Sequence, residues 1–110
     1  MSFEVLTIPP FDRQLKRLVK RYPSLKEEFS KLVDALEVSP EQGTSIGNNC
    51  FKIRLAIASK GKGKSGGARV IANLLYIEET VFLIAIYDKS EKENLSDKEL
   101  RELLSRIHLP

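Results

Sequence analysis

The most distinctive chemistry of this sequence is a block of cationic side chains without a carboxylate among them. Between Asn49 and Val70 there are six lysines and arginines and neither an aspartate nor a glutamate. The formal net charge of the 110-residue chain is only +3, so the positive charge is concentrated locally. This concentration favours a polyanionic partner, although a solvated charged loop would have the same composition. The six residues are Lys52, Arg54, Lys60, Lys62, Lys64 and Arg69.

Part of this block falls on predicted strands, where alternate side chains share one face. Lys52 and Arg54 are two residues apart, and Arg69 begins the next predicted strand, so hairpin pairing brings the three cations together. Tyr87 ends the last predicted strand, and Lys89 follows on the same side if the strand continues. The pattern predicts a cationic patch with one phenol on an open face of a sheet. The solvated face of a half-covered sheet would show the same pattern.

A run of glycines and lysines over residues 59–67 has its own interpretation. Its second half is like the end of a phosphate-binding P-loop. A P-loop would need a glycine at position 58, where this chain has Ala58, and a helix after the loop, where this chain has a predicted strand. These two mismatches argue against nucleotide hydrolysis. The run is either a solubilising turn or a cationic arm that meets nucleic-acid phosphates. Such an arm would present Lys60, Lys62 and Lys64.

Other catalytic groups are scarce. The single histidine, His108, is at the C-terminal end, and the single cysteine, Cys50, has no histidine near it in sequence and is expected in the core. The carboxylates fall on predicted helix surfaces and turns outside the cationic block, which argues against a metal-dependent nuclease. We therefore expect neither a metal site nor a cofactor.

The composition favours one intracellular domain over residues 1–110. The first residues lack the regions of a secretory signal, and the longest apolar run, Val81–Ile86, is too short to cross a bilayer. One cysteine permits no intramolecular disulfide, which suits a reducing cytoplasm. We expect a cytoplasmic protein without a membrane partner.

Hydrophobic periodicity predicts the elements that must position these residues. The order is β-α-α-β-β-β-α, which is an α+β fold with an N-terminal helical hairpin and a C-terminal helix. Three consecutive strands joined by short turns imply a small antiparallel sheet, with the helices on one face. Capping boxes are expected at Ser24–Glu27 and Ser96–Glu99, and a loop at 40–49. The predicted strands cover 3–8, 50–58, 68–77 and 81–87, and the helices 11–22, 25–39 and 97–107.

Three segments resemble the RelE superfamily of bacterial toxins from type II toxin–antitoxin systems. They are the strand Phe51–Arg54, the lysine-glycine turn that leads into Arg69-Val70-Ile71, and the stretch from Leu83 to Leu95 with its tyrosine and lysine. The pattern is most similar to the HigB-type branch, which has a KxR strand, a GKGKSGG-type turn, an RVI strand and a Y-x-K-x-E ending. The helical hairpin and the closing helix fit as well, so the resemblance covers essentially the whole chain.

The resemblance implies an endoribonuclease that cuts messenger RNA, typically in the ribosomal decoding site, and an antitoxin that neutralises it. Relatives often have aromatic residues after the RVI strand, where this chain has Ala72-Asn73, so a possible base-stacking surface is absent. Carried over position by position, the family's basic strand pair is Lys52 and Arg54, its central arginine is Arg69, and its C-terminal tyrosine and lysine are Tyr87 and Lys89.

The chemistry implied is cleavage without metal. RNA supplies its own nucleophile, the 2′-hydroxyl, so the enzyme must align it, remove its proton and stabilise the pentavalent phosphate. Arg54 and Arg69 suit a bidentate clamp on phosphate oxygens. Positive neighbours lower the pKa of tyrosine and lysine side chains, so either type can act as acid or base. The sequence leaves open which of Lys52, Tyr87 and Lys89 is the base.

Two other functions fit the same sequence. A ParE-type toxin shares the fold, poisons DNA gyrase and cuts no RNA, but that branch usually lacks the full set of lysine, arginine and tyrosine. A non-catalytic module would use the cationic face only to dock nucleic acid or an acidic partner. For the ribonuclease, the expected partners are messenger RNA on the ribosome and a cognate antitoxin whose acidic helix or strand covers the basic face. DNA contact is expected only through that antitoxin, because no helix-turn-helix is evident.

Overall fold

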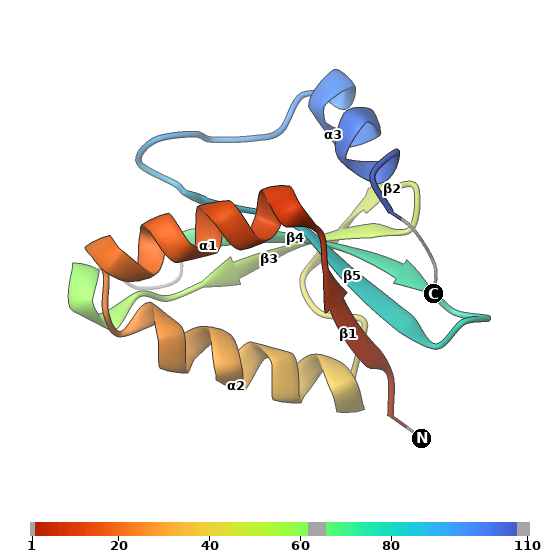
Figure 1. Cartoon of the computed structure of the whole chain (residues 1–110), viewed down its shortest axis with the longest axis horizontal. Helices are drawn as coiled ribbons and strands as arrows, with labels where there is room; N and C mark the ends of the chain where they lie inside the picture. Colours follow the sequence, from red (N-terminus) through yellow and green to blue (C-terminus); the bar gives the residue numbers. More distant parts are fainter. Residues whose placement is uncertain (1, 62–65, 108–110) are drawn as a thin grey trace.

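A computed structural model of the protein describes residues 2–61 and 66–107. The two long helices lie side by side against a twisted sheet, and a short helix stands apart from them near the C-terminal end (Figure 1). The α+β class and the predicted order of elements are confirmed, with one strand added. In chain order the elements are β1 (Glu4–Thr7), α1 (Pro9–Arg21), α2 (Leu25–Val38), β2 (Thr44–Gly47), β3 (Cys50–Leu55), the 3-10 helix η1 (Ala58–Lys60), β4 (Ala68–Leu75), β5 (Thr80–Asp88) and α3 (Asp97–Leu104).

The strands form one sheet in the order β1-β5-β4-β3-β2. Strands β3, β4 and β5 make the antiparallel meander that the short turns predict. The sheet is nevertheless mixed, because β1 runs parallel to β5, with Val5 opposite Val81. The chain between β1 and β5, which includes both long helices and the strands β2 to β4, supplies the long connection that a parallel pair requires.

Strand β2 lies inside the segment predicted to be a loop. It is exposed along its length and pairs with β3 through Thr44 opposite Lys52. An exposed edge strand has no apolar alternation, so its sequence is not distinguishable from that of a polar loop.

The two predicted capping boxes have different outcomes. At α3 the box is confirmed: Ser96 Oγ accepts from the Glu99 N–H at 3.1 Å, and the Glu99 carboxylate accepts from the Ser96 N–H at 3.0 Å. At α2 it is wrong, because Ser24 has helical backbone angles and makes no capping bond. An N-cap side chain needs extended backbone to reach the helix amides. Ser24 Oγ instead accepts from the Ser59 N–H at 2.9 Å and ties η1 to the start of α2.

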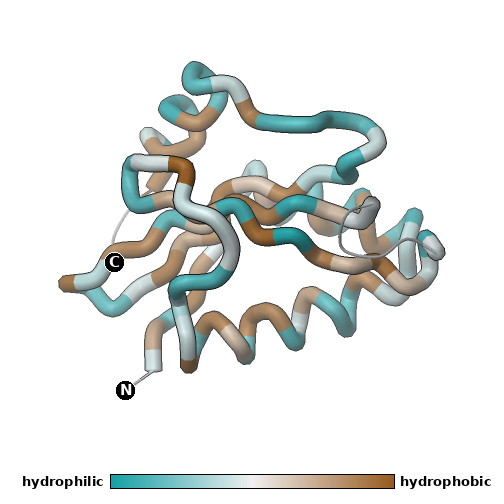
Figure 2. Tube along the Cα trace, turned by 180° about the vertical axis from the view of Figure 1, so that it is seen from behind, coloured by the Kyte–Doolittle hydropathy of each residue, from teal (hydrophilic) through white to brown (hydrophobic). Residues whose placement is uncertain are grey.

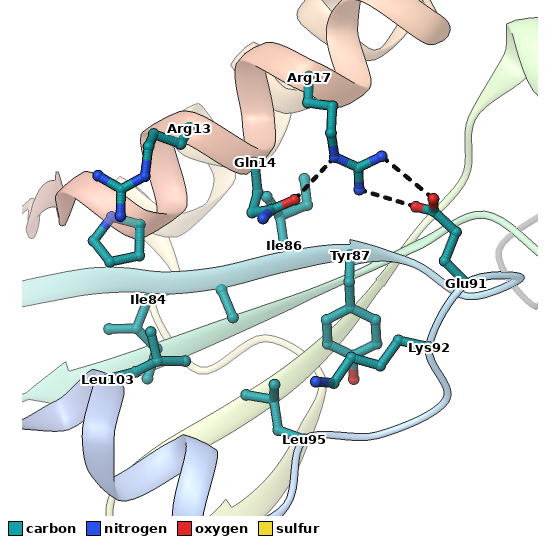
Figure 3. Close-up of a pocket in the computed structure, with 12 residues that line it drawn as sticks. Arg13, Gln14, Arg17, Ile84, Ile86, Tyr87, Glu91, Lys92, Leu95 and Leu103 are labelled. Atoms are coloured by element: carbon teal, nitrogen blue, oxygen red, sulfur yellow. Dashed lines mark hydrogen bonds and ion pairs between the residues drawn. The ribbon is translucent and has the colours of Figure 1, made fainter.

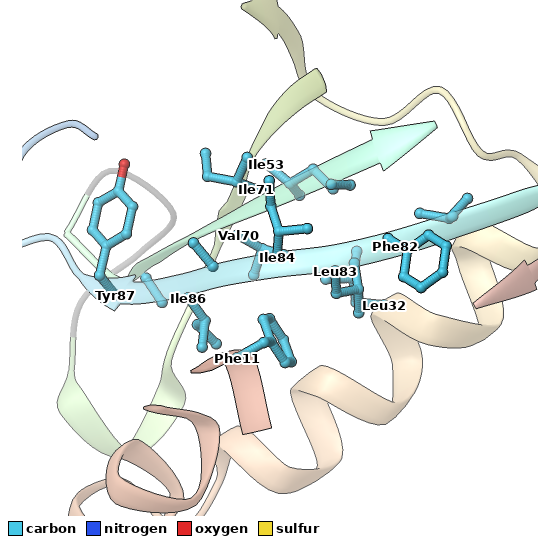
Figure 4. Close-up of a cluster of buried hydrophobic side chains, with 14 of the residues drawn as sticks. Phe11, Leu32, Ile53, Val70, Ile71, Phe82, Leu83, Ile84, Ile86 and Tyr87 are labelled. Carbon is cyan, nitrogen blue, oxygen red and sulfur yellow. The ribbon is translucent and has the colours of Figure 1, made fainter. Parts of the chain in front are cut away.

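The main core lies between the sheet and the helical hairpin. Phe11, Leu18, Leu25 and Leu36 of the hairpin are fully buried. Figure 4 shows Phe11 beside Leu83 and Ile86 on one side of β5, while Tyr87 points to the other side. Seen from behind, the central strands are mostly apolar and the connection before α3 is mostly hydrophilic (Figure 2).

Helix α3 packs on the face of the sheet that the hairpin does not cover. Asp88 bonds to Tyr22 at the end of α1, while its neighbour Tyr87 lines a cleft together with Leu100 of α3. Neighbouring strand residues point to opposite faces. The prediction that all helices pack on one face is therefore wrong for α3. The hairpin already fills one face, and the apolar stripe of α3 is buried on the other.

The capping box at α3 predicts a local stability effect. Ser96→Ala removes one cap and leaves the Glu99 N–H without its partner, so we expect the free energy of unfolding to fall by about 1 kcal/mol. Urea denaturation measures this change, and hydrogen exchange of the α3 amides should locate it. Ser30→Ala, at an exposed position in α2, is the matched control and should change stability by less than about 0.5 kcal/mol. Equal effects of the two substitutions would contradict the assignment.

Candidate functional site

The register of the meander gathers the predicted basic residues and the tyrosine on one face. Arg54 pairs with Arg69, and Arg69 pairs with Tyr87, so these three lie in a row across β3, β4 and β5. Lys52 is two residues before Arg54 and therefore lies on the same face. We call these four residues the cationic face. The structure thus brings together the four residues that strand alternation predicts, on the side of the sheet opposite the helical hairpin.

The cationic face is only partly open, which corrects the expectation of an open face. Arg54 is exposed and Lys52 is half-buried, whereas Arg69 and Tyr87 are only 3% and 7% exposed. The cover is the C-terminal segment, residues 89–107, which includes α3. Its apolar stripe, with Leu100 buried, needs an apolar surface to pack against, and the buried half of this face provides one.

Three contacts hold the C-terminal segment in place. Glu91 accepts from Arg17 Nη2 at 2.9 Å and from Arg21 Nη1 at 3.5 Å, both on α1. Lys52 Nζ donates to Asn94 Oδ1 at 2.8 Å, which links the segment to β3. Within the segment, Lys92 forms an ion pair with Glu99, and the pKa of the Glu99 carboxyl is lowered to about 2, mainly by the hydrogen bond from Lys92.

The hydroxyl of Tyr87 is the most unusual polar group of the site. It is buried and has no hydrogen-bond partner among residues 2–61 and 66–107. Burial raises the pKa of this phenol; the charge of Arg69 opposes the rise and that of Glu99 adds to it. A buried hydroxyl without a partner is rare in folded proteins and needs an explanation. Tyr87 therefore has a covered hydroxyl with an unused hydrogen bond, and burial favours its protonated form.

In the row across β3, β4 and β5, Arg69 lies between Arg54 and Tyr87. Its Nη1 donates to the carbonyl oxygen of Ala68 at 3.0 Å, and its side chain is almost completely buried. A guanidinium keeps its charge even when it is desolvated. Arg69 thus provides a positive charge beside the exposed Arg54 on one strand and Tyr87 on the other.

Two clefts flank Tyr87 on this side of the molecule, and both are lined by Tyr87 and Leu95. The α1 cleft, of about 360 Å³, lies between α1, β5 and the C-terminal segment. The β2 cleft, of about 160 Å³, reaches Lys52 and Asn94. Figure 3 shows the tyrosine ring pointing from β5 between Lys92 and Leu95.

Lys60 has a different environment from the one predicted. Its ammonium donates to Asp88 Oδ1 at 2.5 Å and to the carbonyl oxygen of Gly66 at 2.9 Å, and it lies 5.8 Å from the centre of the Tyr22 ring. Only 12% of the Lys60 side chain is exposed. The Lys60 ammonium is thus paired with a carboxylate on the hairpin side of the sheet, and its predicted contact with phosphate stays a prediction.

Asp88 is the residue that sequence reasoning missed at this point. It accepts from Lys60, from Tyr22 Oη at 2.8 Å, and from the backbone and hydroxyl of Ser90. Although burial opposes ionisation, these hydrogen bonds together hold the pKa of the Asp88 carboxyl far below its ordinary range. The available signal was an acid placed directly after a buried strand, where a charge needs a partner.

The remaining predicted residues are placed as follows. Lys89 is exposed just beyond β5, and its backbone N–H continues the ladder to Gly67 at 3.1 Å. The predictions for Lys62 and Lys64 and that for His108 concern positions outside the described residues. Cys50 is buried, as expected of a core residue, and burial raises the pKa of its thiol.

Neither a metal cluster nor a membrane span is found in the part of the chain that the structure describes. Within residues 2–61 and 66–107, no three histidine, cysteine, aspartate or glutamate side chains come together as metal ligands would. The helices of these residues are also too short or too polar to cross a bilayer.

The fold and the site together define a small α+β domain with a cationic face that includes one buried phenol. A family model described as the RelE toxin of the RelE/RelB toxin–antitoxin system matches residues 12–107. The chain belongs to this family. It is therefore a toxin of a toxin–antitoxin system.

Solved structures of an E. coli toxin show the same fold. A double alanine mutant of E. coli RelE in the free state is 19% identical, with a TM-score of 0.61, and the match covers 98% of this chain and 100% of that chain. The isolated E. coli RelE toxin is 20% identical, with a TM-score of 0.56 and coverage of 97% and 100%. The mutant in complex with an antitoxin RelBc peptide is 23% identical, with a TM-score of 0.54 and coverage of 98% and 100%.

The buried Asp88 predicts a specific pH dependence of stability. Because folding lowers the pKa of Asp88, its contribution is present above the unfolded pKa of about 3.9 and is lost as the pH falls toward the folded value. Asp88→Asn leaves Lys60 without its counter-charge and should cost about 3 kcal/mol at pH 7.

Urea denaturation at pH 7 and at pH 2.5 measures both effects. The Asp88→Asn protein should lose less stability on acidification than the wild type. Asp34→Asn, at an exposed position in α2, is the control and should behave as the wild type. A wild-type stability that is unchanged between the two pH values would contradict the structural role of Asp88.

Proposed function

We propose that this toxin is a metal-independent endoribonuclease that cleaves messenger RNA by attack of the 2′-hydroxyl. The observation that carries the proposal is the row of Arg54, Arg69 and Tyr87 across three paired strands, with the buried tyrosine hydroxyl lacking a partner. A scissile phosphate set against this row meets the exposed Arg54 directly and lies next to the covered guanidinium of Arg69 and the covered hydroxyl of Tyr87. Such groups stabilise the charge that develops on a pentavalent phosphate.

The residues divide the reaction between them. As the 2′-oxygen forms its bond to phosphorus, the bond from phosphorus to the 5′-oxygen breaks, giving a 2′,3′-cyclic phosphate and a 5′-hydroxyl. Tyr87 gives its proton to the leaving 5′-oxygen, because its raised pKa keeps the phenol protonated at neutral pH. Arg54 and Arg69 hold the phosphate oxygens. Removal of the 2′-proton is assigned to Lys52 or Lys89, and mutation of each must decide between them.

The biological setting follows from the family. We propose that the RNA is presented on the ribosome in the cytoplasm and that a cognate antitoxin covers the cationic face. Support for the antitoxin comes from the similar E. coli RelE mutant, which has been solved with an antitoxin RelBc peptide. We further propose that the chain belongs to the HigB-type branch, a proposal supported by its KxR strand, lysine-glycine turn and tyrosine-lysine ending. DNA contact is assigned to the antitoxin.

The proposal is tested by comparing cleavage with stability. Tyr87→Phe removes a hydroxyl that makes no hydrogen bond within the described residues, so the free energy of unfolding should be unchanged. Loss of the proton donor should lower the rate of message cleavage by about 100-fold or more. Arg69→Ala should lower it by a similar factor. The rates are measured by primer extension on messages in a cell-free translation system.

Lys20→Ala removes one positive charge, as Arg69→Ala does, but at an exposed position on α1. It is the control and should keep full activity. Translation inhibition by the wild type without any cut transcript would overturn the proposal. A DNA cleavage-complex assay with gyrase would then test the ParE-type function. If Tyr87→Phe cuts RNA as well as the wild type, the assigned role of the phenol is wrong, although the function stands.

A further inference from the structure

The α1 cleft lies along a part of β5 that no strand covers. Strand β1 pairs with β5 only as far as Leu83, so residues 84–88 have one edge without a strand partner in the described chain. Helix α1 forms one wall beside this edge, and Leu95 and Leu103 of the C-terminal segment form the other (Figure 3). The volume of about 360 Å³ falls within the range of small-molecule sites.

The cleft has an apolar floor and a cationic rim. Ile84 of β5 provides the floor, Leu95 and Leu103 make one wall apolar, and the rim carries Arg13, Arg17 and Lys92. This combination suits a ligand with one flat apolar part and one anionic part.

The cations of the rim are not equally available. Arg17 is held by Gln14 at 3.1 Å and by Glu91, and Lys92 is paired with Glu99. Glu91 is itself neutralised by both Arg17 and Arg21. Arg13 is exposed, and no hydrogen bond or ion pair joins its guanidinium to the described residues. The mouth of the cleft therefore keeps an uncompensated positive charge at Arg13.

We propose that the α1 cleft binds the nucleotide next to the scissile phosphate of the RNA substrate, with its base on the apolar floor and its phosphate at Arg13. This inference rests on the proposed ribonuclease function. The inner end of the cleft is Tyr87, whose ring also bounds the β2 cleft with Lys52. A nucleotide in the α1 cleft thus lies beside Tyr87, the residue that also lines the β2 cleft together with Lys52.

A nucleotide suits this cleft better than an acidic peptide does. One uncompensated guanidinium above an apolar floor matches one phosphate attached to one base. The chain also lacks aromatic residues after the RVI strand, where Ala72 and Asn73 stand, so a base finds no stacking surface there. The Tyr87 ring and the aliphatic floor of the α1 cleft supply an apolar surface beside the site of chemistry.

The test is direct binding of an RNA that cannot be cut. A fully 2′-O-methylated trinucleotide lacks the nucleophile, so its affinity is independent of catalysis. Titration followed by methyl NMR should shift the Ile84 and Leu103 signals. Arg13→Ala should weaken binding about fivefold or more and reduce the slope of log K against log salt by about 0.7, which corresponds to one lost phosphate contact on a single strand.

Lys16→Ala is the matched control, because Lys16 is exposed on the same helix and does not line the cleft. It should change the affinity less than twofold. Equal losses for the two variants, or methyl shifts confined to the β2 cleft, would overturn the subsite. If a hexaglutamate peptide binds in the α1 cleft, shifts the Ile84 signal and has greater affinity than the trinucleotide, the nucleotide subsite is wrong and a protein partner is favoured.

The outcomes separate this inference from the proposed function. If the wild type cuts messages while Arg13→Ala has unchanged affinity and KM, the subsite is wrong and the ribonuclease stands. If the trinucleotide binds in the α1 cleft and the wild type cuts no transcript, the cleft binds RNA without catalysis, and both the ribonuclease function and the position next to a scissile phosphate are wrong.

Discussion

The buried ion pair between Lys60 and Asp88 is the interaction on which the rest of the site depends. Asp88 has no exposed surface, so its charge is tolerated only because Lys60, Tyr22 and Ser90 all donate hydrogen bonds to it. These partners come from the lysine-glycine turn, the end of α1 and the start of the C-terminal segment. One carboxylate therefore holds these three segments to the end of β5, where Tyr87 is placed.

The end of β5 serves two purposes because adjacent strand residues face opposite ways. Asp88 points to the helical hairpin and stabilises the fold, while Tyr87 points to the cationic face and takes part in the proposed chemistry. The row from Arg54 to Tyr87 gains its rigidity from the paired strands. Its reactive groups can thus be held at fixed separation before RNA arrives, which is what proton transfer to a leaving oxygen requires.

The C-terminal segment shapes the site by covering half of it. It shields Arg69 and Tyr87 from water, and the raised pKa of the phenol follows mainly from this desolvation. Its contacts to α1 through Glu91 and to β3 through Asn94 leave a cleft on each side of the tyrosine. The site is thus a partly covered face with a cleft on each side of Tyr87, rather than an open basic surface.

The sequence by itself determined the order of elements and the residues that share the cationic face. Strand alternation and hairpin pairing are local, so the positions of Lys52, Arg54, Arg69 and Tyr87 followed from spacing alone. Only the tertiary structure decided the parallel pairing of β1, the strand β2, the face that α3 covers, the partner of Lys60 and the existence of the clefts. Each of these depends on contacts between segments far apart in the chain, and periodicity within one segment carries no information about which distant surface it meets.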